Sequence, residues 1–303
     1  MASWNRFLFI ALVCLAARTW ADDRHRDHFK SGELSTTFPI LIHEDLIYVP
    51  LEINGRQLKF VLDSGSSRTL VDTAQLKDLN LKEVGSDSLQ GAGQGRVPIR
   101  TLDGFAIRLP GLEMYVDRAS AVDLSPVNKG NSQREDGLLG YPFLSRYVVT
   151  INYQNETMTI TTAEKFVPPT GATPLPIEIR HGWPFIKGAV KPSEDVTLQD
   201  KFFIDSGSSD AVDHPIATQL QSRKPTETGV GLGTPTTGSV AKLWGFQIGP
   251  YLIHNVEVAC CGSSEDTKRM FGGEILSRFT VIFDYPHGQI LLIPNRRYAE
   301  NPN

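Results

Sequence analysis

The sequence predicts an all-β protein made of two similar lobes. Two observations carry this prediction. Short apolar segments alternate with Gly-, Asn- and Pro-containing turns and no long helical pattern occurs, and the whole pattern restarts midway along the chain. The 303 residues are 40% hydrophobic and 21% charged, which is enough for a substantial core. The formal net charge of −4 gives no basic footprint, so nucleic-acid binding is not expected.

The first 37 residues are expected to precede the folded lobes. Residues 1–21 combine a positively charged start with an apolar run too short to span a bilayer, and they end in Thr-Trp-Ala. We therefore expect a cleaved signal peptide and a secreted or periplasmic protein, with an uncleaved leader that anchors the chain to a membrane as the alternative. Residues 22–37 are polar, lack apolar periodicity and predict a flexible arm.

Residues 38–165 are expected to form the N-terminal lobe. Strands are expected at 46–53 and 57–63, which are joined by an Asn-Gly pair, the strongest short hairpin signal. A short helix is expected at 72–79, where apolar residues recur every three to four positions. The later strands of this lobe are expected at 97–101, 104–109, 114–122, 147–153 and 157–162.

A proline-rich segment, residues 166–176, predicts a linker, and the first pattern then repeats over 177–297. The repeat is carried by two landmarks that recur in the same order. Residues 60–67 (Phe-Val-Leu-Asp-Ser-Gly-Ser-Ser) recur as 202–209 (Phe-Phe-Ile-Asp-Ser-Gly-Ser-Ser), and residues 140–153 recur as 272–285. Two ordered matches indicate a second lobe of the same kind rather than chance similarity.

Each copy of the first landmark places a carboxylate, Asp63 or Asp205, directly after an apolar strand. A carboxylate at the end of a buried strand is costly unless it is hydrogen-bonded or has a chemical role. Two such acids in equivalent places predict a symmetric pair that shares one proton.

These residues resemble those of the pepsin/retropepsin superfamily of aspartic proteases. The Asp-Thr/Ser-Gly signature of that superfamily occurs at Asp63 and Asp205, and its second signature, two apolar residues and a glycine, ends at Gly140 and Gly272. The resemblance extends from about residue 38 to residue 294. It implies two pseudo-symmetric retropepsin-like β-barrel lobes with an active-site cleft between them, in an aspartic endopeptidase that needs no cofactor and no metal.

By this resemblance Asp63 and Asp205 form the catalytic dyad. Hydrolysis of a peptide bond by water needs a base for the water and an acid for the carbonyl oxygen, and one shared proton supplies both roles. Which acid is the base cannot be assigned, because the pKa values belong to the pair. Gly65 and Gly207 are expected to let the backbone turn tightly and bring amide groups close to the acids.

Four serines are expected to support the dyad. Ser64 and Ser206 are implied to cross between the lobes, each hydroxyl bonding the backbone of the opposite loop. Ser66 and Ser208 are implied to donate hydrogen bonds to the outer carboxylate oxygens and so fix the geometry of the pair.

Two glycine-rich stretches are expected to form flaps over the site, with plain loops as the alternative. Their glycines are Gly91, Gly93, Gly95, Gly229, Gly231 and Gly233. Neither stretch contains the tyrosine of pepsin-type flaps, and this absence, with the near-equal halves, favours lean retropepsin-like lobes. An extended peptide or protein substrate would lie in the cleft and form strand-like hydrogen bonds.

Other interpretations remain open at this stage. A catalytically silent peptide-binding protein could have the same fold, and the lobes could pair between chains rather than within one monomer. His214 is expected to cap a turn or helix rather than to catalyse, and turn or cap roles are expected for Asp72, Asp136, Asp210 and Asp213. The adjacent Cys260 and Cys261 are expected to be thiols, with a vicinal or intermolecular disulfide as the alternative.

Overall fold

The computed structural model describes residues 27–129, 131–228, 231–260 and 268–300. Strands dominate these residues, and each α-helix among them spans a single turn, so the prediction of an all-β protein is confirmed. The expected signal peptide, residues 1–21, lies outside the described residues, as do the first residues of the expected arm. No helix in the described part of the chain is long and apolar enough to cross a membrane.

The N-terminal lobe is built on one large sheet. Its order is β1-β10-β9-β4-β5-β12-β6-β11-β8-β7, and β3 pairs with β4 off this path. The strands are β1 (His28–Phe29), β3 (Leu41–His43), β4 (Leu46–Ile53), β5 (Arg56–Leu62), β6 (Leu70–Asp72), β7 (Glu83–Gln90), β8 (Arg96–Leu102), β9 (Phe105–Leu109), β10 (Leu112–Val116), β11 (Ala119–Val122) and β12 (Gly137–Leu139).

The C-terminal lobe has a second large sheet. Its order is β20-β21-β24-β19-β25-β18-β17-β22-β23, and β16 pairs with β17. The strands are β16 (Glu178–Arg180), β17 (Trp183–Ser193), β18 (Val196–Ile204), β19 (Val212–Asp213), β20 (Lys224–Thr228), β21 (Thr236–Lys242), β22 (Gly245–Ile248), β23 (Tyr251–His254), β24 (Glu257–Cys260) and β25 (Met270–Phe271).

The two sheets have the same topology. The path β10-β9-β4-β5-β12-β6-β11-β8-β7 in the first lobe matches β23-β22-β17-β18-β25-β19-β24-β21-β20 in the second, strand for strand. The match includes two parallel pairings in each lobe, β5 with β12 and β6 with β11 in the first, β18 with β25 and β19 with β24 in the second. The sequence repeat is therefore a repeat of structure.

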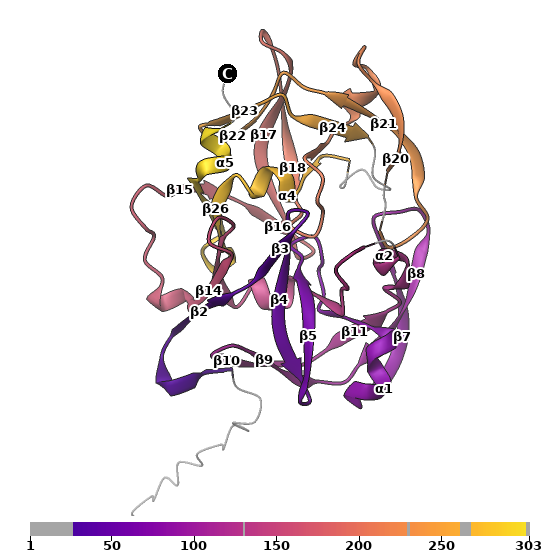
Figure 1. Ribbon diagram of the computed structural model, residues 1–303, viewed down its shortest axis with the longest axis vertical. Coiled ribbons are helices and arrows are strands. Elements are labelled where there is room, and N and C mark those ends of the chain that lie inside the picture. The colour runs from indigo at the N-terminus through magenta and orange to yellow at the C-terminus, as the bar shows by residue number, and fades with distance from the viewer. Residues whose placement is uncertain (1–26, 130, 229–230, 261–267, 301–303) are drawn as a thin grey trace, which may run out of the picture.

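A third sheet joins the lobes, because it takes strands from both halves of the chain (Figure 1). Its order is β15-β27-β26-β13-β14-β2, and β13 of the first half pairs antiparallel with β26 of the second. The strands are β2 (Ser35–Pro39), β13 (Tyr147–Asn152), β14 (Thr157–Thr162), β15 (Thr173–Pro176), β26 (Phe279–Asp284) and β27 (Gln289–Pro294). One buried apolar cluster includes residues of both lobes and of this sheet.

Short helical turns punctuate the strands. The α-helices are α1 (Leu76–Leu79), α2 (Ser125–Asn128), α3 (Tyr141–Leu144), α4 (Gly273–Leu276) and α5 (Arg296–Ala299). The 3₁₀ turns are η2 (Lys30–Gly32), η3 (Thr73–Gln75), η4 (Ala163–Lys165), η5 (Pro215–Thr218) and η6 (Tyr285–His287). The helix expected at 72–79 is η3 followed by α1, with Asp72 as its N-cap and Asn80 in the left-handed region at its end.

The expectation of a flexible arm over 22–37 is wrong for the part that the structure describes. His28 and Phe29 pair with β10 as β1, and residues 35–39 form β2 against β14. The Asp27 carboxylate accepts hydrogen bonds from the Tyr147 hydroxyl at 2.5 Å and from the Tyr115 amide at 2.9 Å. Local polarity misled the prediction, because the partners of this segment are supplied by strands far along the chain.

Two further segments differ from expectation. The strand expected at 114–122 is split into β10 and β11, because β10 pairs antiparallel with β9 whereas β11 runs parallel to β6. The last residues of the proline-rich segment 166–176 form β15, an edge strand on β27. Prolines are tolerated there because an edge strand leaves one row of backbone groups unpaired.

Candidate active site

The two Asp-Ser-Gly loops leave the ends of equivalent strands in the two lobes. β5 ends at Leu62 and β18 ends at Ile204, so Asp63 and Asp205 are the first residues after these two strands. The Asp63 amide donates to the Leu139 carbonyl at 3.1 Å, and the Asp205 amide donates to Phe271 at 3.0 Å. Each acid is therefore held by the strand that carries the second signature of its own lobe.

The structure brings the two acids together across the lobe boundary. A hydrogen bond joins the carboxyl groups of Asp63 and Asp205. The Gly65 amide donates to Asp63 Oδ1 at 2.8 Å, and the Gly207 amide donates to Asp205 Oδ1 at 2.9 Å. A Cβ atom on Gly65 would lie 2.5 Å from Asp205 Oδ1, and one on Gly207 would lie 2.5 Å from Asp63 Cγ. Glycine is needed at both places because each loop packs directly against the carboxyl of the other.

Ser64 and Ser206 join the loops through four reciprocal hydrogen bonds. Ser64 Oγ donates to the Ile204 carbonyl at 2.8 Å and accepts from the Ser206 amide at 2.9 Å. Ser206 Oγ donates to the Leu62 carbonyl at 2.8 Å and accepts from the Ser64 amide at 2.9 Å. Both serines are buried, so the four bonds fix the position of one lobe's loop relative to the other.

The roles expected for Ser66 and Ser208 are wrong. Ser66 Oγ donates to the carbonyl of Arg68 at 2.9 Å rather than to a carboxylate. Ser208 Oγ accepts from the amide of Asp210 at 3.2 Å. Both hydroxyls satisfy the backbone of their own turn, which is the local bonding that serine commonly makes. One oxygen of each dyad carboxyl, Oδ1, is instead held by a glycine amide.

The environment favours one shared proton on the dyad. Burial raises the pKa of Asp63 well above its usual range, and the neighbouring Asp205 raises it further. Burial also raises the pKa of Asp205. Two carboxyl groups within hydrogen-bonding distance cannot both ionise without strong repulsion, so the singly protonated pair is the stable state over the intermediate pH range.

Tyr285 is a neighbour of the dyad that the sequence analysis did not select. Burial raises the pKa of Tyr285 well above its usual range, and the charges of Asp63 and Asp205 raise it further. Its phenol therefore stays neutral near the two acids. The only signal in the sequence was its place at the end of the second repeated landmark, where Tyr153 is the counterpart.

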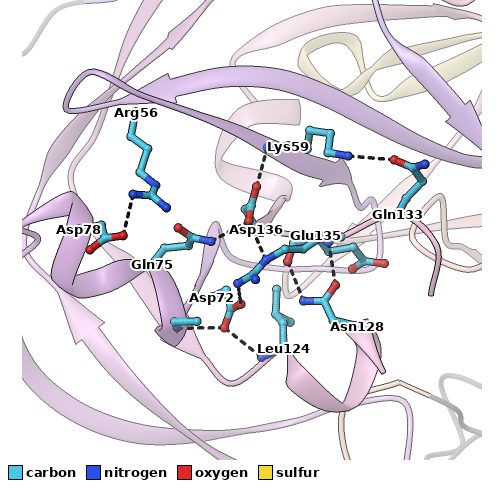
Figure 2. A network of polar contacts seen from close by, with 12 residues as sticks. Arg56, Lys59, Asp72, Gln75, Asp78, Leu124, Asn128, Gln133, Glu135 and Asp136 are labelled. Atoms are coloured by element: carbon cyan, nitrogen blue, oxygen red, sulfur yellow. Dashed lines mark hydrogen bonds and ion pairs between the residues drawn. The ribbon is translucent and has the colours of Figure 1, made fainter. Parts of the chain in front are cut away.

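A polar network anchors the start of β12 to β5 in the N-terminal lobe (Figure 2). The Asp136 carboxylate accepts from the Lys59 amide at 3.0 Å, from Gln75 Nε2 at 2.7 Å and from Arg134 Nε at 3.1 Å. Asp72 accepts from the Ala74 amide at 3.1 Å and from Arg134 Nη2 at 3.1 Å. The expected cap role of Asp72 is confirmed, whereas Asp136 bonds to β5 and to two side chains rather than to a turn or a helix end. This network fixes the strand that ends at the dyad.

Glu135 is a buried acid beside this network. Burial raises its pKa to about 7, and its charge contributes to the raised pKa of Asp63. Its Oε1 accepts from Asn131 Nδ2 at 3.3 Å. No sequence signal distinguished Glu135 from an ordinary loop acid.

The C-terminal lobe uses a different set of residues in the corresponding place. His214 is the N-cap of η5, where its Nδ1 accepts from the Ile216 amide at 3.1 Å, so the expectation of a cap is confirmed. Its Nε2 lies 3.6 Å from Asp200 Oδ2, and Arg269 donates to the same carboxylate. Asp210 lies in the turn before β19 and is exposed. Asp213 has no such role, because no hydrogen bond to its carboxylate is found among the described residues.

The glycine-rich stretches form the tips of two hairpins, β7–β8 and β20–β21, which meet on one side of the molecule (Figure 1). The Gly93 amide donates to the Leu232 carbonyl at 2.9 Å, and Gln94 and Thr234 exchange backbone hydrogen bonds of 2.8 and 3.0 Å. A Cβ on Gly91 would lie 2.2 Å from the Leu232 carbonyl oxygen. The glycines of the two tips that the structure describes are Gly91, Gly93, Gly95, Gly231 and Gly233, while Gly229 lies outside the described residues.

The hairpins also contact the strands that follow the first acid. Leu70, at the start of β6, belongs to a buried cluster with Val122 and Leu124. Leu89 of one hairpin and Leu232 of the opposite tip pack against the same cluster. The two hairpins are therefore packed on the dyad side of the N-terminal lobe as well as on each other.

Other features of the structure lie apart from the dyad. A surface hollow of about 860 Å³ is lined by residues of the third sheet and its neighbours, among them Thr150, Thr159 and Thr280. No group of three or more His, Cys, Asp or Glu side chains suited to a metal ion occurs within the described residues. Cys260 is disulfide-bonded rather than a thiol, and the two other cysteines, Cys14 and Cys261, lie outside the described residues.

Comparison with known proteins agrees with this geometry. Residues 49–143 match the family model described as aspartyl protease, a stretch that includes the first Asp-Ser-Gly loop and the first apolar-apolar-glycine signature. A search of curated proteins found no match for the chain.

Proposed function

Since residues 49–143 match the aspartyl protease family model, we propose that the chain is an exported aspartic endopeptidase with Asp63 and Asp205 as its catalytic dyad. One observation carries the proposal: the two carboxyl groups are hydrogen-bonded to each other and are held by identical loops from two equivalent lobes. A pair of capping acids in an inert barrel would have no need of this mutual contact.

The dyad supplies the two proton transfers of hydrolysis. The ionised carboxyl takes a proton from a water molecule as that water attacks the carbonyl carbon of the scissile bond. The protonated carboxyl gives its proton to the carbonyl oxygen, which yields a neutral tetrahedral intermediate. Collapse of this intermediate breaks the C–N bond: one of its hydroxyls returns a proton to the ionised carboxyl, and the other carboxyl gives its proton to the leaving amine, so the pair again holds a single proton.

An extended peptide is the substrate class that the surrounding strands support. The hairpins β7–β8 and β20–β21 offer backbone groups at their tips, where glycines allow close approach. A substrate that adds to these tips as a strand would gain backbone hydrogen bonds whatever its sequence. The hairpins would have to part to admit it, because their tips are bonded to each other.

One chain contributes both halves of the site, so the proposed enzyme is active as a monomer. Export is proposed from the features of residues 1–21, and a disulfide at Cys260 supports an oxidising compartment.

The test is a peptide digest with single dyad variants. Asp63→Asn and Asp205→Asn should each lower kcat/KM by about 10³-fold or more, because either change removes the shared proton pair. Asp78→Asn is the matched control, since Asp78 is an exposed acid paired with Arg56. Near-normal activity of either dyad variant would overturn the proposed mechanism. Binding of peptides by the wild-type protein without cleavage at any pH would identify a silent peptide-binding protein instead.

The pH dependence of the wild-type rate provides a second check on the dyad. The rate should follow a bell-shaped curve, because only the singly protonated dyad, with one ionised and one protonated carboxyl, is active. The raised pKa values of Asp63 and Asp205 place the alkaline limb above the range of an ordinary carboxyl group.

A further inference from the structure

In the antiparallel pairing of the two lobes Asp213 lies where Leu70 lies, although Asp213 follows its Asp-Ser-Gly acid by eight residues and Leu70 follows its own by seven. Leu70 pairs antiparallel with Leu138, and Asp213 pairs antiparallel with Met270. Leu138 and Met270 are themselves equivalent, because each lies two positions before the signature glycine of its lobe. The register of the sheets thus aligns a leucine with an aspartate.

This position faces the hairpins rather than the interior of the lobe. Leu70 packs with Leu89 and Leu232, which come from both hairpins. In the C-terminal lobe the neighbouring Val212 belongs to the central core, and successive residues of a strand point to opposite faces. The side chain of Asp213 therefore points to the face opposite Val212, where the charge of Asp205 acts on it.

The Asp213 carboxylate is buried and has no partner among the residues that the structure describes. Asp213 is 7% exposed, and none of the hydrogen bonds or ion pairs among the described residues involves its side-chain oxygens. These oxygens are also not among the sealed, partnerless polar atoms of the described residues, such as the Trp183 indole nitrogen. They therefore keep a small solvent-accessible area.

An unpaired carboxylate in such a place is costly to keep. Burial raises the pKa of Asp213 to about 7, and the charges of Asp210 and Asp205 add to the effect. A buried acid without a partner destabilises the fold, and it is retained where a ligand supplies the missing cation. The neighbouring charges that act on it are both negative, which would further favour a positively charged ligand group.

We propose that Asp213 is the specificity residue for a lysine or arginine side chain of the substrate, bound on the C-terminal-lobe side of the scissile bond. The inference rests on the proposed peptidase function. A basic side chain that reaches the Asp213 carboxylate would neutralise the acid and form a charge-assisted hydrogen bond. Leu70, at the matching position of the other lobe, offers no charge, so the preference is confined to one side of the scissile bond.

A peptide library cleaved by the wild-type protein is the first test. Lysine and arginine should be enriched at one substrate position on one side of the cleaved bond. Cleavage without basic enrichment would overturn this inference and leave the proposed peptidase intact. A wild-type protein that cleaves nothing would overturn the peptidase itself, and the specificity with it.

The second test compares two peptides that differ only by lysine or methionine at the enriched position. Asp213→Asn should lower the kcat/KM ratio of the lysine to the methionine peptide by about tenfold to a hundredfold, as expected for loss of a largely buried charge pair. Asp213→Glu should retain part of the preference. Asp213→Leu, which copies the residue of the other lobe, should remove it and serves if the Asn variant fails to fold.

Asp195→Asn is the matched control, because it removes the same charge from an exposed turn of the same lobe. It should leave the ratio within about twofold of the wild-type value, as expected where only a screened surface charge is lost. An equal fall in both variants would show that the general negative field, rather than Asp213, selects the basic side chain, and would overturn the proposal.

Discussion

In the N-terminal lobe the strand after the first Asp-Ser-Gly loop begins with Leu70, which is covered by apolar residues of both hairpins. In the C-terminal lobe the equivalent strand carries Asp213, a buried acid with a raised pKa. The loops themselves differ little, since the hydroxyls of Ser64 and Ser206 each donate to a backbone carbonyl of the opposite lobe. The comparison teaches that duplication preserved the groups that hold the two acids together, whereas the strands beside them diverged in charge.

The largest effect should come from the two serines that both lobes share, Ser64 and Ser206. Ser64→Ala and Ser206→Ala should each lower the free energy of unfolding by about 2–4 kcal/mol, because each leaves a buried carbonyl and a buried amide without a partner. Urea unfolding of the two variants measures this. Ser64→Thr and Ser206→Thr retain the hydroxyl and are the controls. A lower free energy of unfolding in only one of the two alanine variants would contradict the equivalence of the two loops.

The dyad glycines should have the next largest effect, and again equally in both lobes. Gly65→Ala and Gly207→Ala each place a Cβ against the opposite carboxyl group, so the pair must separate. A displacement of this kind should reduce kcat/KM by about 10²-fold. Steady-state kinetics measure the loss, and Gly85→Ala, whose Cβ would make only an ordinary contact with Thr101 at 3.8 Å, is a control for folding. Loss of activity with unchanged thermal stability would separate a positioning defect from unfolding.

The smallest effect should come from Asp213, the position at which the two lobes differ. The pKa of Asp213 is raised in the folded protein, so the folded state binds the proton more tightly than the unfolded chain. Its contribution is therefore most favourable below the unfolded pKa and is lost as the pH rises through about 7. Asp213→Asn should raise the free energy of unfolding by about 1–3 kcal/mol at pH 8 and have little effect near pH 4.

Thermal unfolding of Asp213→Asn across this pH range gives the measurement. Asp195→Asn, at an exposed turn of the same lobe, should change stability at neither pH. If Asp213→Asn were less stable than the wild type at pH 8, the carboxylate would have an unrecognised partner, and the contrast with Leu70 would fail.

Local signals predicted much of the fold. The strand expected at 46–53 is β4 and that expected at 157–162 is β14, because both combine β-branched or aromatic residues with clear turn signals. By contrast, β7 is polar along most of its length, so no alternation marked it as a strand. Likewise β2 is defined only by its pairing with β14, which no local pattern reports.

The same distinction applies to the site. Asp63, Asp205 and their glycines were found because the repeat is written in adjacent residues. The hydroxyl of Ser66 was assigned to the wrong acceptor, because the choice between a carboxylate and the Arg68 carbonyl depends on the shape of the turn. Asp213 was expected to be a turn residue, since its equivalence to Leu70 appears only in the register of two sheets.

The sheet shared by the two lobes has a consequence for how the chain is made. β13 is complete when residue 152 has been synthesised, but its partner β26 begins only at Phe279. Until then β13 presents an open edge, and such edges pair readily with other chains. We therefore expect the partly synthesised chain to be prone to strand exchange with other chains. The rate of translation and the binding of chaperones to the nascent chain should then determine the yield of folded protein.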